Sequence, residues 1–192
     1  MQSEKAIVAR ICHDLITPFN AINLGLEAFE MSRDESLLSS IRESVDKANC
    51  IMRFMRELFS DKSQMFCYSD TSLKQMIAEF LKFYNITFDL KSDMENVAYI
   101  AGKIIMYMAI VTKEIMPYGG MVTTTINDED SEISTKCCGR NIVVPQMKIE
   151  NEENINQKNI IKQHLMLLLN ESGFELTVIS EGQDVIFIKK IK

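Results

Sequence analysis

The sequence is poor in the features that build nucleotide-binding loops, membrane spans and disulfide frameworks. Its 192 residues include seven glycines, three prolines and no tryptophan, and no two glycines stand in a Gly-x-Gly spacing. No apolar run approaches the roughly 18 residues that a membrane-spanning helix needs, and the start, Gln2-Ser3-Glu4-Lys5, lacks a signal-peptide core. The five cysteines follow no framework spacing, which predicts reduced thiols in a cytoplasmic protein.

Charge and apolar content narrow the class of protein further. The chain has 21 basic and 27 acidic residues, and its net charge of -6 argues against a nucleic-acid partner. Hydrophobic residues make up 46% of the chain, which is enough to fill one or two cores at this length. We therefore expect a globular protein with neither a nucleic-acid nor a membrane partner.

A sustained heptad pattern dominates the N-terminal part of the chain. It predicts a helix over residues 5–31 with a broad apolar stripe. The columns of this stripe are Val8, Leu15, Ile22 and Phe29; Ile11, Pro18 and Gly25; and Cys12, Phe19 and Leu26. His13 lies roughly 140° from the first column at about 100° per residue, so its imidazole is expected to face solvent.

A second heptad pattern over residues 35–60 predicts an antiparallel partner helix. Ser32 and Glu35 have the spacing of a capping box at its start. The columns of the second helix are Leu38, Val45, Met52 and Phe59, and Ile41, Ala48 and Met55. The short connection predicts a helical hairpin. Because two such wide stripes cannot cover each other fully, burial implies a homodimer in which two hairpins form a four-helix bundle.

Beyond about residue 61 the pattern changes to short strands and helices. Strands are expected over residues 65–69, 86–91, 121–126, 132–138, 174–180 and 184–191, and helices over 73–83, 97–116 and 159–171. An acidic turn occupies residues 127–130, and residues 141–156 fit neither pattern. The prediction is a helical domain at 1–62 and an α+β sandwich at 63–192, with helices on one face of a mostly antiparallel sheet.

The segment His13-Asp14-Leu15-Ile16-Thr17-Pro18 resembles the H-box of sensor histidine kinases, and the order of the two domains resembles the core of those kinases. In the H-box a phosphoacceptor histidine is followed by an acid and, five residues on, by proline. A kinase also needs a glycine-rich cradle for the triphosphate and a metal ligand. The chain has no Gly-x-Gly run, and the helix expected over 97–116 contains no asparagine. The second domain therefore looks like a degenerate ATPase-type sandwich that has lost ATP.

A narrower family resembles the chain over nearly its whole length. Residues 12–27, which begin Cys12-His13-Asp14, are similar to the ChpT-type histidine phosphotransferases of alphaproteobacterial phosphorelays. The helix end Met116-Pro117-Tyr118-Gly119-Gly120 matches a second feature of that family, whereas Thr17 replaces an expected serine and Asn20 an expected glycine. The resemblance implies a homodimeric, ATP-independent phosphotransferase. It would shuttle phosphate from the receiver domain of a hybrid kinase to downstream response regulators.

The residues around His13 suit this chemistry. A neutral imidazole can attack the aspartyl phosphate of a receiver domain and hold the phosphoryl group as a phosphoramidate. Asp14 is placed to orient the ring or accept its proton, and Thr17, one turn further, to hydrogen-bond the incoming phosphoryl group. Arg10, one turn earlier, is placed to neutralise the charge of that group. No cofactor or metal is expected on this chain, since the essential Mg²⁺ would be bound by the receiver domain.

Two other functions stay open at this point. One is a dimeric docking module for response regulators that has no catalytic activity, and the other is an ATP-dependent histidine autokinase with an unrecognised nucleotide site. The second histidine, His164, has no acid–proline context and is expected to be a surface residue. The pair Cys137-Cys138 lacks the second pair that a structural zinc site would need.

Overall fold

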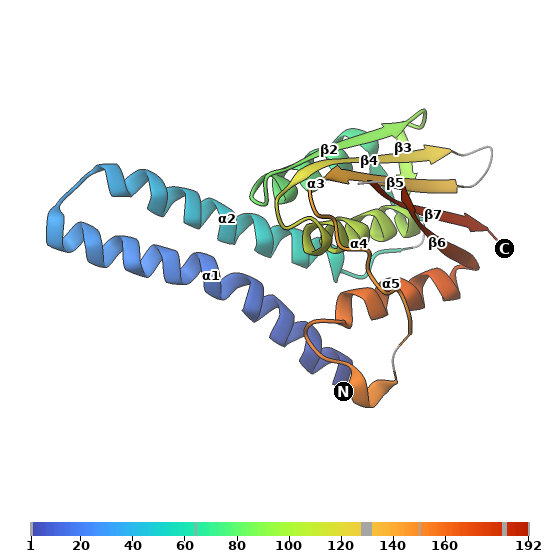
Figure 1. Cartoon of the computed structure of the whole chain (residues 1–192), viewed down its shortest axis with the longest axis horizontal. Helices are drawn as coiled ribbons and strands as arrows, with labels where there is room; N and C mark the ends of the chain where they lie inside the picture. Colours follow the sequence, from blue (N-terminus) through green and yellow to red (C-terminus); the bar gives the residue numbers. More distant parts are fainter. Residues whose placement is uncertain (1, 64, 128–131, 150, 182–183, 192) are drawn as a thin grey trace.

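A long helical hairpin precedes an α/β region in the computed structural model of the chain (Figure 1). Helix α1 (Gln2–Ser32) and helix α2 (Ser36–Leu58) lie side by side, and the turn between them projects away from the rest of the molecule. Both helices lie close to the extents predicted from the heptads. The structure describes residues 2–63, 65–127, 132–149, 151–181 and 184–191.

The start of α2 differs from the predicted capping box. Glu35 is the N-cap residue, but its side chain makes no capping hydrogen bond. Asp34 Oδ1 instead accepts from the backbone N–H of Ser36 at 2.9 Å. The capping-box prediction is wrong because the chain leaves α1 through Arg33 at a φ of 55°, which brings the side chain of Asp34 to the new helix end.

The two helices of the hairpin approach closely at Gly25. A Cβ at this position would lie 2.6 Å from Cγ1 of Ile41, so a larger residue would push the helices apart. Part of the predicted stripe is covered by this packing: Ile11, Leu15 and Ile22 are half-buried and Pro18, Ala48 and Met55 are buried. Other large apolar side chains of the stripes are exposed in the single chain, namely Val8, Phe19, Leu26, Leu38, Val45 and Met52.

Five strands form the main sheet in the order β2-β4-β5-β7-β6. They are β2 (Ile86–Ser92), β4 (Gly120–Asn127), β5 (Glu132–Gly139), β6 (Phe174–Glu181) and β7 (Asp184–Ile191). Strands β2 and β4 are parallel and the other three pairings are antiparallel, as the predicted mostly antiparallel sheet requires. The acidic turn predicted at 127–130 lies, apart from Asn127, outside the described residues.

A second, two-stranded sheet pairs β1 (Cys67–Ser69) with β3 (Asn96–Ala98). Strand β3 was not predicted, because Val97 and Ala98 were assigned to the helix expected over 97–116. Residues 140–149, which the sequence left unassigned, form neither helix nor strand, and a 3-10 helix (Glu152–Asn154) follows. The division of the chain at residue 62 stays a prediction.

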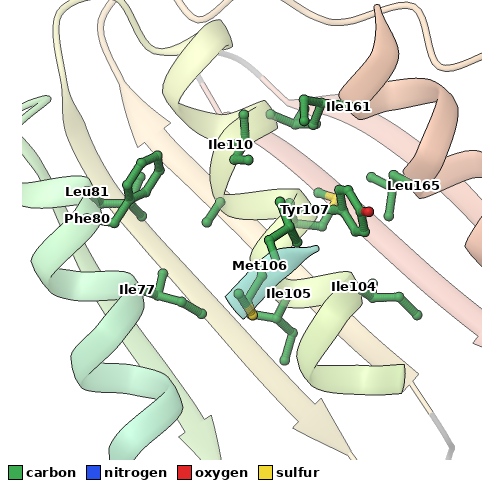
Figure 2. Packing of buried hydrophobic residues seen from close by; sticks show 14 of the residues in the cluster. Ile77, Phe80, Leu81, Ile104, Ile105, Met106, Tyr107, Ile110, Ile161 and Leu165 are labelled. Carbon is green, nitrogen blue, oxygen red and sulfur yellow. The ribbon is translucent and has the colours of Figure 1, made fainter. Parts of the chain in front are cut away.

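Three helices cover one face of the main sheet (Figure 1). They are α3 (Asp70–Lys82), α4 (Tyr99–Ile115) and α5 (Ile160–Glu171). Figure 2 shows α4 between the other two, with Ile105 and Met106 among the side chains that fill the space around it. Helix α4 is apolar on nearly all sides because it is surrounded on nearly all sides. The predicted fold class, a helical part followed by an α/β sandwich, is confirmed.

The turn between α4 and β4 depends on glycine. Gly119 has a φ of 73°, and a Cβ there would lie 2.2 Å from the carbonyl oxygen of Asn85. The same carbonyl accepts a hydrogen bond from the N–H of Gly120 at 3.0 Å. This contact brings the start of β4 beside the start of β2, which is the parallel pairing of the sheet.

Two sets of contacts join α2 to the α/β region. The rings of Phe54 and Phe80 stack with centroids 4.1 Å apart. Lys103 of α4 donates through Nζ to the backbone carbonyl oxygens of Glu57, Leu58 and Ser60, so the carbonyls at the end of α2 receive partners from α4. In the part of the chain that the structure describes, no helix is both long and apolar enough to cross a membrane.

Candidate active site

His13 lies on the solvent side of α1, as its angular position in the heptad predicted. Its side chain is 64% exposed, and Nδ1 lies 3.3 Å from Oδ1 of Asp14. When Nδ1–H donates in this contact, the lone pair of the neutral ring lies on Nε2. The arrangement therefore offers Nε2 as the nucleophilic atom of an exposed imidazole.

Asp14, in contrast to its exposed neighbour, has a nearly buried side chain. Its Oδ2 accepts from Nζ of Lys113 at 3.0 Å and from Nε of Arg10 at 3.2 Å, and its side chain is 5% exposed. Burial alone would raise the pKa of Asp14, but the two cations outweigh burial and hold the pKa below its ordinary value. Asp14 is thus an ionised group with one oxygen toward His13 and the other toward α4.

Arg10 is also held by the α/β region. Its Nη1 lies 2.7 Å from Oε1 of Glu114 and donates to the backbone carbonyl of Gln157 at 3.3 Å. Lys162 of α5 lies 3.8 Å from the other carboxylate oxygen of Glu114. The expectation that Arg10 faces an incoming phosphoryl group is therefore wrong in this structure, because Arg10 is buried and its guanidinium is held by Glu114 and the carbonyl of Gln157.

Lys113 reaches Asp14 past two aromatic rings. Its Nζ lies 4.5 Å from the ring centroid of Tyr84 and 5.8 Å from that of Phe80. Burial lowers the pKa of Lys113, and the ion pair with Asp14 opposes that shift. Burial raises the pKa of Tyr84, and the charge of Asp14 acts in the same direction. The ammonium group is therefore enclosed by rings on one side and by a carboxylate on the other.

The sequence analysis named four residues near this point, Arg10, His13, Asp14 and Thr17, and missed two. Thr17 is exposed one turn beyond His13, and its predicted contact with a phosphoryl group stays a prediction. Lys113 and Glu114 were missed. Their signal was available, since with Lys103 they are the only charged residues in the otherwise apolar α4.

The second histidine lies away from these residues, on α5. His164 is half-buried, with Nδ1 3.3 Å from the hydroxyl of Tyr107 and its ring centroid 6.2 Å from that of Phe59. The expectation of a surface residue is wrong because α5 packs this side against α4. Burial also lowers the pKa of His164 from its ordinary value.

Metal-ligating side chains are scattered over the molecule. Across the ranges that the structure describes, no three His, Cys, Asp or Glu side chains gather closely enough to hold a metal ion. All five cysteines lie within those ranges, and each is a free thiol.

A family model and a relative of known name are similar to this chain. The family model for the histidine phosphotransferase C-terminal domain matches residues 71–184. The protein phosphotransferase ChpT of Brucella abortus (strain 2308) is 26% identical over 193 residues, which cover 94% of this chain and 91% of that protein.

Two solved structures share the fold of the chain. One, described as a bacterial phosphotransferase at 1.7 Å, has a TM-score of 0.85 at 22% identity and covers 98% of this chain and 95% of its own. The other is the Acinetobacter baumannii histidine kinase AdeS, with a TM-score of 0.50 at 12% identity over 94% of this chain and 97% of its own. Both likenesses concern the fold alone.

The family match carries the identification. It spans more than half of the 192 residues, and it includes Lys113 and Glu114 of α4. His13, Asp14 and Thr17 precede the matched range, so their roles stay predictions. The resemblance stated from the sequence is confirmed: the chain belongs to the histidine phosphotransferase family.

Proposed function

We propose that this chain carries a phosphoryl group from the aspartate of one receiver domain to that of another, with His13 as the phosphoacceptor and without ATP. The observation that carries the proposal is the exposed imidazole whose Nδ1 lies 3.3 Å from Asp14 Oδ1. Membership of the histidine phosphotransferase family supports phosphoryl transfer in general. The donor is the receiver domain of a hybrid kinase, and the acceptors are response regulators.

The reaction proceeds by nucleophilic attack of His13 Nε2 on the phosphorus of the aspartyl phosphate. An N–P bond forms, the P–O bond to the receiver breaks, and the receiver aspartate leaves as a carboxylate. The proton stays on Nδ1, so the ring becomes cationic, and the nearby carboxylate of Asp14 stabilises that charge. Thr17 donates a hydrogen bond to a phosphoryl oxygen. Transfer to the second receiver is the same reaction in reverse.

The Mg²⁺ that the reaction needs is held by the receiver domain, and the chain itself binds neither nucleotide nor metal. The lack of any Gly-x-Gly spacing supports this part of the proposal. Titration of the full chain with Mg-ATP tests it, and we expect no heat of binding. Saturable binding together with labelling of His13 by ATP would establish the autokinase instead.

The functional unit is a homodimer formed by the hairpin. The exposed columns support it, because Val8 on α1 and Met52 on α2 are 61% and 51% exposed in the single chain. Apolar residues that repeat every seven positions form a seam along a helix, and such a seam can pack against the same seam on a second copy. Pairing of two hairpins through these columns would complete a four-helix bundle.

Labelling with a phosphorylated receiver domain tests the central proposal. The full chain should acquire an acid-labile, base-stable label, and His13→Ala should abolish it without loss of fold, because an exposed side chain contributes little to the core. His164→Gln is the matched control and should be labelled like the wild type. Label retained in His13→Ala would contradict the proposal, and a wild type that binds the receiver without label would favour the docking module.

A further inference from the structure

We infer that Lys113 is a positioning residue for phosphotransfer, which holds Asp14 from α4 and through Asp14 sets which ring nitrogen of His13 is free to react. This inference rests on the proposed function and adds to it a task for the α/β region. That region, which lacks the glycine pattern of an ATP-binding domain, would support the reacting histidine on the neighbouring hairpin instead.

The two oxygens of Asp14 have different partners, and this division is the basis of the inference. Oδ2 accepts from Lys113 at 3.0 Å and from Arg10 at 3.2 Å, while Oδ1 lies 3.3 Å from Nδ1 of His13. Adjacent residues on a helix point about 100° apart, so Asp14 faces His13 only when its rotamer is fixed. An exposed aspartate would instead exchange among rotamers and bind water.

Lys113 provides a contact that the hairpin cannot provide by itself. Arg10 lies four residues before Asp14 on the same helix, whereas Lys113 comes from 99 residues further along the chain. Its side chain is 13% exposed, which places the ammonium group behind Asp14 rather than at the surface that a receiver would touch. Lys113 therefore acts on the reaction through Asp14.

The groups around Asp14 come from α1, from α4 and from the segment that follows α3. Arg10 and His13 lie on α1, Lys113 and Glu114 on α4, and the ring of Tyr84 follows α3. Glu114 pairs with Arg10 rather than with Lys113. Loss of the ammonium group at 113 would leave Asp14 with Arg10 as its remaining cationic partner in this group.

Loss of the Lys113 contact has a definite chemical consequence. A mobile Asp14 would no longer favour the tautomer with Nδ1–H, and part of the His13 population would carry the proton on Nε2 and be unreactive there. The cation formed on attack would also be less stabilised. The rate of transfer should fall about tenfold, the lower end of the loss seen when the hydrogen-bond partner of a metal-ligating histidine is removed. The KM for the phosphorylated receiver should not change, since Lys113 does not reach the docking surface.

The test compares the full chain with Lys113→Met, which keeps the aliphatic stem but removes the charge. Lys74→Met is the matched control, because Lys74 pairs with Asp89 at 2.6 Å, away from Asp14. Two quantities are measured: the maximal transfer rate against receiver concentration, and the tautomer of His13 by nitrogen NMR of the unphosphorylated protein. In Lys113→Met we expect a slower maximal rate, an unchanged KM and a mixed tautomer, whereas Lys74→Met matches the wild type. Lys113→Arg should recover most of the rate.

A double-mutant cycle with Asp14→Asn separates positioning from a general structural effect. If Lys113 acts through Asp14, Lys113→Met should cause no further loss of rate in the Asp14→Asn background. An equal loss in both backgrounds would overturn the inference, and so would a wild-type rate and tautomer in Lys113→Met.

Two further outcomes are separated by the same measurements. If Lys113→Met unfolds, Lys113→Gln replaces it, with a smaller tautomer change expected and a wild-type tautomer counting against the inference. If the wild type takes up no label, the proposed function fails. The NMR comparison then still tests whether Lys113 fixes the His13 ring.

Discussion

The helical hairpin and the α/β region differ in how completely they bury their own apolar surface. In the α/β region the central helix α4 is enclosed by α3 and α5, and Ile110 and Met106 have no measurable exposure (Figure 2). In the hairpin, one apolar column on each helix is open, with Leu26 and Leu38 more than two-fifths exposed. The α/β region thus closes its core within one chain, whereas the hairpin needs a second surface.

The candidate site obtains its rigidity from the α/β region rather than from the hairpin. His13 belongs to the incompletely covered part, but Asp14 beside it is paired with Lys113 of the well-packed part. A reacting group can therefore be exposed while its neighbour is fixed. The two regions should therefore differ in their responses to substitution and to pH.

The largest effect is expected in the α/β core. Phe80→Ala should lower the free energy of unfolding by about 3–5 kcal/mol, because a fully buried ring is replaced by a cavity. Its stacking with Phe54 at 4.1 Å would be lost as well. Urea denaturation measures the change. The control Tyr118→Ala removes a ring that is 69% exposed and should change stability by less than about 0.5 kcal/mol. Equal losses of stability in Phe80→Ala and Tyr118→Ala would contradict the expectation that the closed α/β core provides the stability.

The second effect concerns the open face of the hairpin. Val45→Asp should convert the proposed dimer to a monomer, since each apolar side chain of this size gains roughly 1.5–3 kcal/mol on burial and a carboxylate loses it. Light scattering measures the mass, and circular dichroism should show that the helices persist. Ser39→Asp adds the same charge on α2 outside the exposed column and should remain dimeric. A monomeric wild type at micromolar concentration would refute the proposed interface.

The third effect is the pH dependence of the Asp14 ion pairs. Because the pKa of Asp14 is lowered in the folded protein, its stabilisation is complete above its ordinary pKa of about 4 and is lost as pH falls through the lowered value. Asp14→Asn should therefore cost about 1.5–3 kcal/mol of unfolding free energy at neutral pH. The difference from the wild type should shrink toward zero in acid.

A matched aspartate makes the acid experiment specific. Asp89 also has a lowered pKa, from its hydrogen bond with Lys74, but its side chain is 41% exposed. Asp89→Asn should change the unfolding free energy much less at neutral pH, because solvent screens an exposed pair. If both substitutions changed the unfolding free energy equally, burial of the Asp14 ion pairs would not increase their contribution to stability.

The smallest effect is expected at His164, between α5 and α4. Burial lowers its pKa, so the folded chain binds this proton more weakly than the unfolded chain does. Its contribution is therefore complete above the ordinary pKa of about 6.5 and declines as pH falls toward the lowered value. Unfolding free energies across this window should decline less in His164→Gln than in the wild type. Identical slopes would show that burial of His164 is not coupled to folding.

Local patterns predicted the hairpin well because its contacts repeat along the chain. The heptads located both helices, and the angular position of His13 predicted its exposure. They did not predict that Asp14 would be buried, because its partner Lys113 is 99 residues away. Periodicity indicates that one side of a helix packs, but it does not indicate which element packs against it. Arg10 illustrates the same limit, since its spacing from His13 suggested phosphate binding, while Glu114 and Gln157 of the α/β region hold its guanidinium together with Asp14.

Most α/β elements were predicted from their own periodic patterns. Strand β3 was missed because it runs directly into α4, and the start of α4 was accordingly placed two residues early. The sequence did contain a sign of the missed ion pairs. Lys113 and Glu114 are charged residues in a helix that is otherwise apolar, and such residues need partners once the helix is buried.

The hydrogen bond from Arg10 to the carbonyl of Gln157 spans 147 positions and has a consequence for synthesis of the chain. During translation the hairpin leaves the ribosome before the α/β region, and segments that emerge earlier generally fold earlier. Its open column is then available to another nascent or finished copy. The contacts behind His13, by contrast, form later, only after α4 and the segment around Gln157 have emerged. Assembly of the proposed dimer would therefore precede completion of the contacts around His13. A chain truncated before Gln157 would carry His13 without its full set of supporting contacts.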